Sequence, residues 1–129
     1  MEASSSSAAL SERARAVLRT LGLGEASEVD FAPDSSPGRV SIVHGTTADV
    51  IWCDETGRET TSTSQFATTL NLSPVAGDWV SIRDGYIIAV SPRSTELRRP
   101  GANPGEVQVL AANIDVVLVV LPIDRDLTS

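Results

Sequence analysis

The chain has 129 residues, 41% of them hydrophobic, and a formal net charge of −7. This length fits one ordinary domain, or a short β domain with flanking pieces. The negative charge argues against nonspecific binding to nucleic acid, because phosphate backbones attract clustered cations. The acidic excess lies mainly at the two ends, since residues 37–100 carry six Arg against seven acidic residues. The chain has no Lys, so every cation is a guanidinium, which suits forked contacts with phosphate.

A single cysteine, Cys53, excludes an internal disulfide and any zinc site built from cysteines. With His44 as the only imidazole, we interpret Cys53 as a small hydrophobic residue. The first residues have neither the basic start nor the apolar stretch of a signal peptide. The longest apolar run, Val116–Leu121, is too short to span a bilayer. We therefore expect a cytoplasmic monomer without membrane contacts.

Residues 1–37 are predicted to be an N-terminal extension that contains a short helix at about residues 10–21. Apolar residues recur at helical spacing there, and Gly22 stands where such a helix would end. The helix is expected to pack its apolar stripe on the following domain or on a partner.

From Arg39 the hydrophobic period changes to two, which predicts strands. Turn residues follow about every ten positions, and Asp84-Gly85 is a strong signal for a hairpin. Residues 38–97 are therefore predicted to form a five-stranded OB-fold barrel, with a helical turn at about residues 66–72 closing one end. The expected strands are Arg39–His44, Asp49–Asp54, Glu59–Ser64, Trp79–Arg83 and Tyr86–Ser91.

Two different patterns follow the barrel. Residues 98–108 are rich in Pro and Gly and are predicted to be a linker. Asn113–Pro122 is a nearly continuous β-branched run, which is typical of a strand buried on both faces of a parallel sheet. Because such a strand needs neighbours, we interpret residues 109–129 as the first strand of a truncated α/β domain. The expected fold is thus mainly β, with the start of a second domain.

The order of several segments resembles the N-terminal portion of the ribosome small-subunit-dependent GTPase A family (RsgA, also called YjeQ). The resemblance covers about residues 38–126. The segments that carry it are Val75-Ala-Gly-Asp-Trp-Val80, Pro92-Arg-Ser-x-x-Leu-x-Arg99 and Gln108-Val-Leu-Ala-Ala-Asn-Ile-Asp115.

The resemblance implies an OB-fold followed by a circularly permuted GTPase domain and a zinc-binding region. It also implies docking on the small ribosomal subunit and its ribosomal RNA, and GTP hydrolysis late in the maturation of that subunit. GTP, magnesium and zinc are the cofactors implied for the full-length family. This sequence lacks the phosphate-binding loop, which requires a lysine, so we predict no GTP, metal or catalytic residue here and no activity for this chain alone.

OB-folds bind oligonucleotides across strands two and three and through the flanking loops. Cations and polar groups in those places are the candidate contacts, although each also fits an ordinary loop role. Trp52 and Trp79 alternate with aliphatic residues and are expected in the core. The large side chains available as core anchors are Phe31, Trp52, Phe66, Trp79 and Tyr86. The predicted RNA-binding residues are Arg39, His44, Thr46, Thr47, Arg58, Arg93, Arg98 and Arg99.

Three other functions stay open. The chain could be a stand-alone OB-fold module that binds nucleic acid. The Gly77-Asp78 turn also resembles biotinyl and lipoyl carrier domains, but those need a lysine that is absent here. The chain could also be an inactive truncated remnant, which would be more soluble if it ended at about residue 100, because unpaired apolar strands associate.

Overall fold

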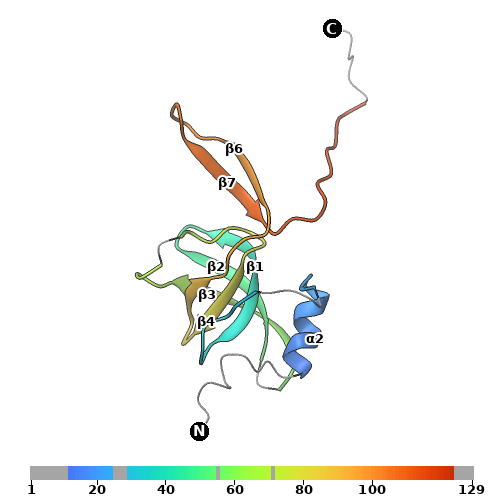
Figure 1. Ribbon diagram of the computed structural model, residues 1–129, viewed down its shortest axis with the longest axis vertical. Coiled ribbons are helices and arrows are strands. Elements are labelled where there is room, and N and C mark those ends of the chain that lie inside the picture. The colour runs from blue at the N-terminus through green and yellow to red at the C-terminus, as the bar shows by residue number, and fades with distance from the viewer. Residues whose placement is uncertain (1–11, 25–28, 55, 71, 124–129) are drawn as a thin grey trace.

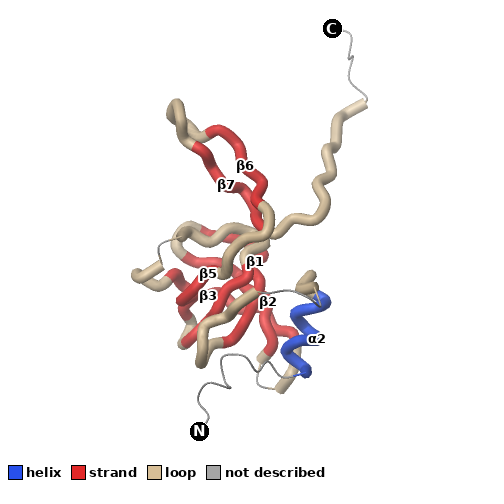
Figure 2. Tube along the Cα trace, in the orientation of Figure 1, coloured by secondary structure: helices blue, strands red, loops and turns tan. Residues whose placement is uncertain are grey.

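The computed structural model describes residues 12–24, 29–54, 56–70 and 72–123, and a closed β-barrel forms its main body (Figures 1 and 2). The strand order is β1-β2-β3-β5-β4, and the pairing of β1 with β4 closes the barrel. β3 and β5 are parallel, whereas the other neighbours are antiparallel. This arrangement is that of an OB-fold, so the predicted fold class is confirmed. The strands are β1 Ser36–His44, β2 Thr47–Cys53, β3 Glu59–Phe66, β4 Trp79–Arg83 and β5 Tyr86–Val90.

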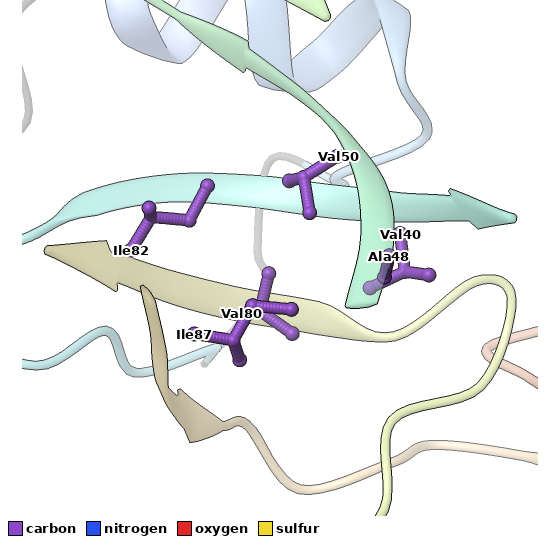
Figure 3. Close-up of a cluster of buried hydrophobic side chains, with 6 residues drawn as sticks. All are labelled: Val40, Ala48, Val50, Val80, Ile82 and Ile87. Carbon is purple, nitrogen blue, oxygen red and sulfur yellow. The ribbon is translucent and has the colours of Figure 1, made fainter. Parts of the chain in front are cut away.

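Small aliphatic side chains fill the barrel. Successive residues of a strand point to opposite faces, so the alternating apolar residues of β1, β2 and β4 meet inside. Phe66 and Leu70 pack against this cluster. The buried residues of the cluster are Val40, Ala48, Val50, Val80, Ile82 and Ile87 (Figure 3).

The turns between strands follow the predicted chemistry at two places. Gly45 has a φ of 68° in the β1–β2 turn. Asp84 and Gly85 both have positive φ, which is what the favoured two-residue hairpin requires. The predicted helical turn at residues 66–72 is wrong: residues 68–69 form a turn in which the Leu70 amide donates to the Ala67 carbonyl. The side chains of Phe66 and Leu70 reach the core without a helix.

Helix α2 (Glu12–Thr20) packs against the outside of β1 and β2 (Figure 1). It ends at Gly22, whose φ is 107°, and the Leu23 amide donates back to the Leu18 carbonyl at 2.9 Å. This is the glycine-terminated cap that the sequence predicted. The fully buried Leu18 belongs to a second apolar cluster outside the barrel, with Leu23 and Trp79.

A β-hairpin follows the barrel where a linker was predicted. β6 (Glu96–Pro100) pairs with β7 (Val107–Ala112), and the hairpin stands out from one end of the barrel (Figure 1). The prediction that residues 98–108 are a linker is therefore wrong. The Pro and Gly residues of this segment lie at the end of β6 and in the loop at the tip of the hairpin. A proline at these places does not interrupt a central ladder of hydrogen bonds. A chain ending at about residue 100 would lose β7.

Residues 113–123 do not form the predicted strand. They run away from the barrel as an extended segment without ladder partners among the described residues (Figure 1). Each residue of Val116–Leu121 is at least 55% exposed. An apolar strand requires neighbouring strands for its backbone groups, and the described part of the chain offers none. Membership of this segment in a second domain stays a prediction.

Candidate nucleic-acid interface

The β1–β2 turn presents three of the predicted contacts on the barrel surface. The His44 side chain is 51% exposed, and its Nε2 lies 3.3 Å from the Asp49 Oδ2 atom. Hydrogen bonds from Thr63 and His44 hold the pKa of Asp49 below its usual range. Thr46 is exposed, while the Thr47 hydroxyl donates to the His44 carbonyl at 3.3 Å. The turn therefore offers an imidazole and a hydroxyl to solvent on a short, well-braced loop.

Arg58 lies at the other end of β2 and is separated from His44 by the length of that strand. A strand of this length spans about 20 Å. The β2–β3 turn is organised by Asp54, whose carboxylate accepts from Thr56 and from the Arg58 amide. These bonds, first that from the Thr56 hydroxyl, lower the pKa of Asp54 to about 2. The exposed Arg58 guanidinium therefore does not share a patch with the β1–β2 turn.

The Arg39 guanidinium is used inside the protein. Its nitrogens donate to the carbonyl oxygens of Leu21, Gly77 and Asn113, and it lies over the Trp79 ring, 4.9 Å from the ring centroid. The pKa of Arg39 is lowered, mainly because the guanidinium is partly buried. Arg39 thereby links the end of α2, the barrel and the start of the extended segment. We leave it out of the RNA surface for this reason.

Arg93 is also held within the protein. Its side chain is 7% exposed, and its Nε and Nη2 atoms each lie 2.9 Å from an oxygen of the fully buried Asp78 carboxylate. Arg93 also donates to Glu96 and to the Ser73 carbonyl. The hydrogen bond with Asp78 is the main cause that raises the pKa of Arg93. This buried pair joins the loop before β4 to the base of the β6–β7 hairpin.

Arg98 and Arg99 lie on β6 and are exposed to solvent. Arg98 is paired with Glu96, whose pKa is lowered first by Arg93 and then by Arg98. The Nε atom of Arg99 donates to the Gln108 side chain at 3.0 Å, which leaves its terminal nitrogens without a partner in the described part of the chain. Arg99 is thus the hairpin cation best placed to contact a phosphate.

The hairpin stands beside the second half of β1. Ile42 and Val43 of β1 line one open groove together with Gln108, Val109 and Leu110 of β7. Since β1 leads directly into the β1–β2 turn, the turn and the hairpin lie on connected parts of the surface. The predicted residues therefore divide into a surface group (His44, Thr46, Thr47, Arg98, Arg99), a separate Arg58, and two structural arginines.

Sequence reasoning counted Tyr86 among the core anchors, but the structure places it outside. Tyr86 is 42% exposed, whereas the next residue, Ile87, is fully buried. Trp79 is buried and Trp52 packs against the core while its Nε1 donates to Ser62, so their predicted packing roles are confirmed. The signal for Tyr86 was the alternation with Ile87 directly after the Asp84-Gly85 turn. Cys53 is buried, and that burial raises the pKa of its thiol, as suits a packing residue.

The described residues do not fit the cofactors implied for the family. They contain no group of three or more His, Cys, Asp or Glu side chains arranged for a metal ion. A phosphate-binding loop needs a lysine, which the sequence lacks. The Asp124-Arg125-Asp126 segment of the sequence resembles a metal-binding Asp-x-Asp motif but lacks a third ligand, and it lies outside the described residues. No helix in the described ranges is long and apolar enough to cross a membrane.

Comparison with known proteins identifies relatives of this chain. A protein from Leptospira interrogans is 37% identical over 98 residues, which cover 70% of this chain and 26% of that protein. A protein from Syntrophotalea carbinolica is 33% identical over 109 residues, which cover 72% of this chain and 29% of that protein. Both are named small ribosomal subunit biogenesis GTPase RsgA. The chain is a relative of the RsgA proteins.

An RsgA protein from Xanthomonas campestris is 43% identical over 51 residues, which cover 39% of the chain and 14% of that protein. The chain spans only about a quarter of the length of the RsgA relatives that match most of it. No family model matches the chain, and no solved structure matches it significantly. The relationship to RsgA therefore rests on sequence similarity.

Proposed function

We propose that this chain is the part of a small ribosomal subunit biogenesis GTPase that docks the protein on ribosomal RNA. The similarity to RsgA over most of the chain is the observation that carries the proposal. The barrel supports it because the β1–β2 turn and the strands beside it are the places where OB-folds bind oligonucleotides. We also propose that the protein is a monomer and acts in the cytoplasm.

In this proposal, residues outside this sequence hydrolyse GTP. The 129 residues include no lysine for a phosphate-binding loop, and the described residues do not fit zinc. GTP, magnesium and zinc would therefore be held elsewhere in such a protein. This chain positions the protein on the small ribosomal subunit, because the exposed β1–β2 turn and the β6–β7 hairpin of its rigid barrel contact that subunit.

The RNA contact is proposed to rely more on hydrogen bonds and stacking than on charge. The chain is acidic overall, and its surface group contains only His44, Arg98 and Arg99 as cations or potential cations. Each phosphate contact to a single strand adds about 0.7 to the salt dependence of binding, so we expect a shallow slope.

Replacing His44 and Thr46 together with alanine is expected to weaken binding to purified small ribosomal subunits about tenfold. Two lost hydrogen bonds, each contributing about 0.5–1.5 kcal/mol, account for this size. A titration of labelled chain with subunits, read by fluorescence anisotropy, measures the effect. The matched control is Thr68→Ala, which removes an exposed hydroxyl from the turn between β3 and β4, away from strands two and three.

Three results would count against this proposal. Binding of the wild-type chain that is no stronger to small than to large subunits would favour a general nucleic-acid module. The proposal also fails if the His44→Ala/Thr46→Ala variant binds as tightly as the Thr68→Ala control. A loss in that variant that is accompanied by a lower melting temperature would indicate damage to the turn instead of a lost contact.

A further inference from the structure

A row of outward-facing side chains runs around the barrel from the β1–β2 turn to the β4–β5 turn. The strand register pairs His44 with Thr47, Thr47 with Gln65, and Gln65 with Tyr86. Residues directly opposite each other on neighbouring strands have side chains on the same face, with Cβ atoms about 5 Å apart. These four residues therefore form one continuous line, and Arg83, paired with Tyr86, ends it.

The backbone holds the two turns side by side along this row. The Phe66 amide donates to the Thr46 carbonyl at 3.1 Å, and the Gln65 amide donates to the Gly85 carbonyl at 3.0 Å. Consecutive amides at the end of β3 thus fasten one turn each. The row is rigid because it lies across these bonds, and five positions at the usual strand spacing extend over about 20 Å.

Two side chains in the middle of the row have no partner within the described residues. Neither the Gln65 amide nor the Tyr86 hydroxyl takes part in a hydrogen bond there, although both side chains are exposed. Among the Phe, Trp and Tyr side chains of the described residues, Tyr86 is the one that is exposed, since the others are buried or partly buried. An exposed ring next to a free amide offers a stacking surface together with a donor and an acceptor.

The charges along the row favour single-stranded RNA over duplex RNA as the ligand. Arg83 already donates to the carbonyls of Pro33 and Asp34, and Asp49 and Asp84 lie beside the row. A duplex presents mainly phosphates and would require several free cations here. An unpaired base offers its π-face and its edge, which suit a tyrosine and a glutamine.

We propose that the row His44-Thr47-Gln65-Tyr86 is a platform for single-stranded RNA, with an unpaired base stacked on Tyr86 and its edge bonded by Gln65. The platform joins the two turns into one surface, and it rests on the proposed function because the RNA is that of the small ribosomal subunit. Stacking tolerates any base, so the platform selects unpaired nucleotides over paired ones more than it selects a sequence.

The test compares three single variants of the whole chain in binding to purified small subunits and to their protein-free RNA. Tyr86→Ala is expected to weaken binding to both about tenfold or more, which is within the range for the loss of one base stack. Tyr86→Phe keeps the ring and therefore the stack, so it is expected to bind within about threefold of the wild type. A threefold change in affinity corresponds to less than half the free energy of a tenfold change, so the two variants can be distinguished. The control is Leu72→Ala, which removes a side chain of nearly equal exposure, 41%, from a loop outside the row.

The outcomes separate this platform from the proposed function. If the wild type binds small subunits but Tyr86→Ala behaves like Leu72→Ala, the platform is contradicted while the docking role stands. If Tyr86→Phe is as weak as Tyr86→Ala, the hydroxyl and not the ring makes the contact, which also contradicts stacking. A loss with subunits but not with protein-free RNA would assign Tyr86 to a ribosomal protein. Failure of the wild type to bind either target would contradict both proposals.

Discussion

Replacing Arg93 with alanine is expected to lower the free energy of unfolding by about 3–5 kcal/mol, the usual cost of leaving a buried charge without its partner. The charge left behind is Asp78, which is fully buried and accepts two hydrogen bonds from Arg93. Such a loss is a large fraction of the total stability of a small domain. Urea unfolding followed by tryptophan fluorescence measures it.

The matched control for Arg93→Ala is Arg98→Ala. Both arginines pair with Glu96, but Arg98 is 63% exposed, so its loss is expected to cost only about 0–1 kcal/mol. Removing Asp78 together with Arg93 should cost less than the sum of the two single changes, because no unpaired charge then stays buried. Equal stability of the Arg93→Ala and Arg98→Ala variants would contradict the structural role of Arg93 and would return it to the candidate RNA contacts.

Replacing Gly77 with alanine is expected to be more destabilising than the same change at Gly85, by about 1–3 kcal/mol, the usual cost of forcing extra volume into a packed site. Both glycines have positive φ, so both variants carry the same kind of backbone strain. At Gly85 an added Cβ meets open space, whereas at Gly77 it would clash with the Ala112 carbonyl oxygen. The difference between the two variants therefore isolates the close approach of β7 to the turn.

The site of that close approach is the junction between the barrel and the hairpin. The Ala112 amide donates to the Ala76 carbonyl, and the Asn113 side chain donates to the Gly77 carbonyl. In the Gly77→Ala variant, hydrogen exchange should therefore be faster at the β7 amides than at the amides of the barrel. If Gly77→Ala and Gly85→Ala unfold at the same urea concentration, or if β7 stays protected, the junction is not fastened in this way.

The barrel could be predicted from the sequence because local signals agree there. The alternation of apolar residues, the Asp84-Gly85 turn and Gly22 at the end of the helix each specify local backbone geometry, and the structure follows all three. The hairpin was missed because Pro100 and the Gly residues near it have the composition of a loop. Only the pairing of β6 with β7, which depends on contacts across the tip, makes this segment regular.

The candidate site was harder to predict than the fold. A sequence shows where charges occur but not which partners they have, so Arg39 and Arg93 were interpreted as free cations. Apart from Glu96, their partners are backbone carbonyls and the Asp78 carboxylate, which lie 15 or more residues away in the chain. Tyr86 was overlooked for the opposite reason: its ring suggested the core, although its alternation with Ile87 places it outside.

Chemical probing of the RNA in purified small subunits, with and without the chain, tests the central claim most directly. The account predicts that the wild-type chain protects a small set of unpaired nucleotides, and that the Tyr86→Ala and His44→Ala/Thr46→Ala variants lose these protections at chain concentrations that saturate the wild type. Binding of the chain that leaves every nucleotide as reactive as in the free subunit would contradict the claim that this barrel docks on ribosomal RNA.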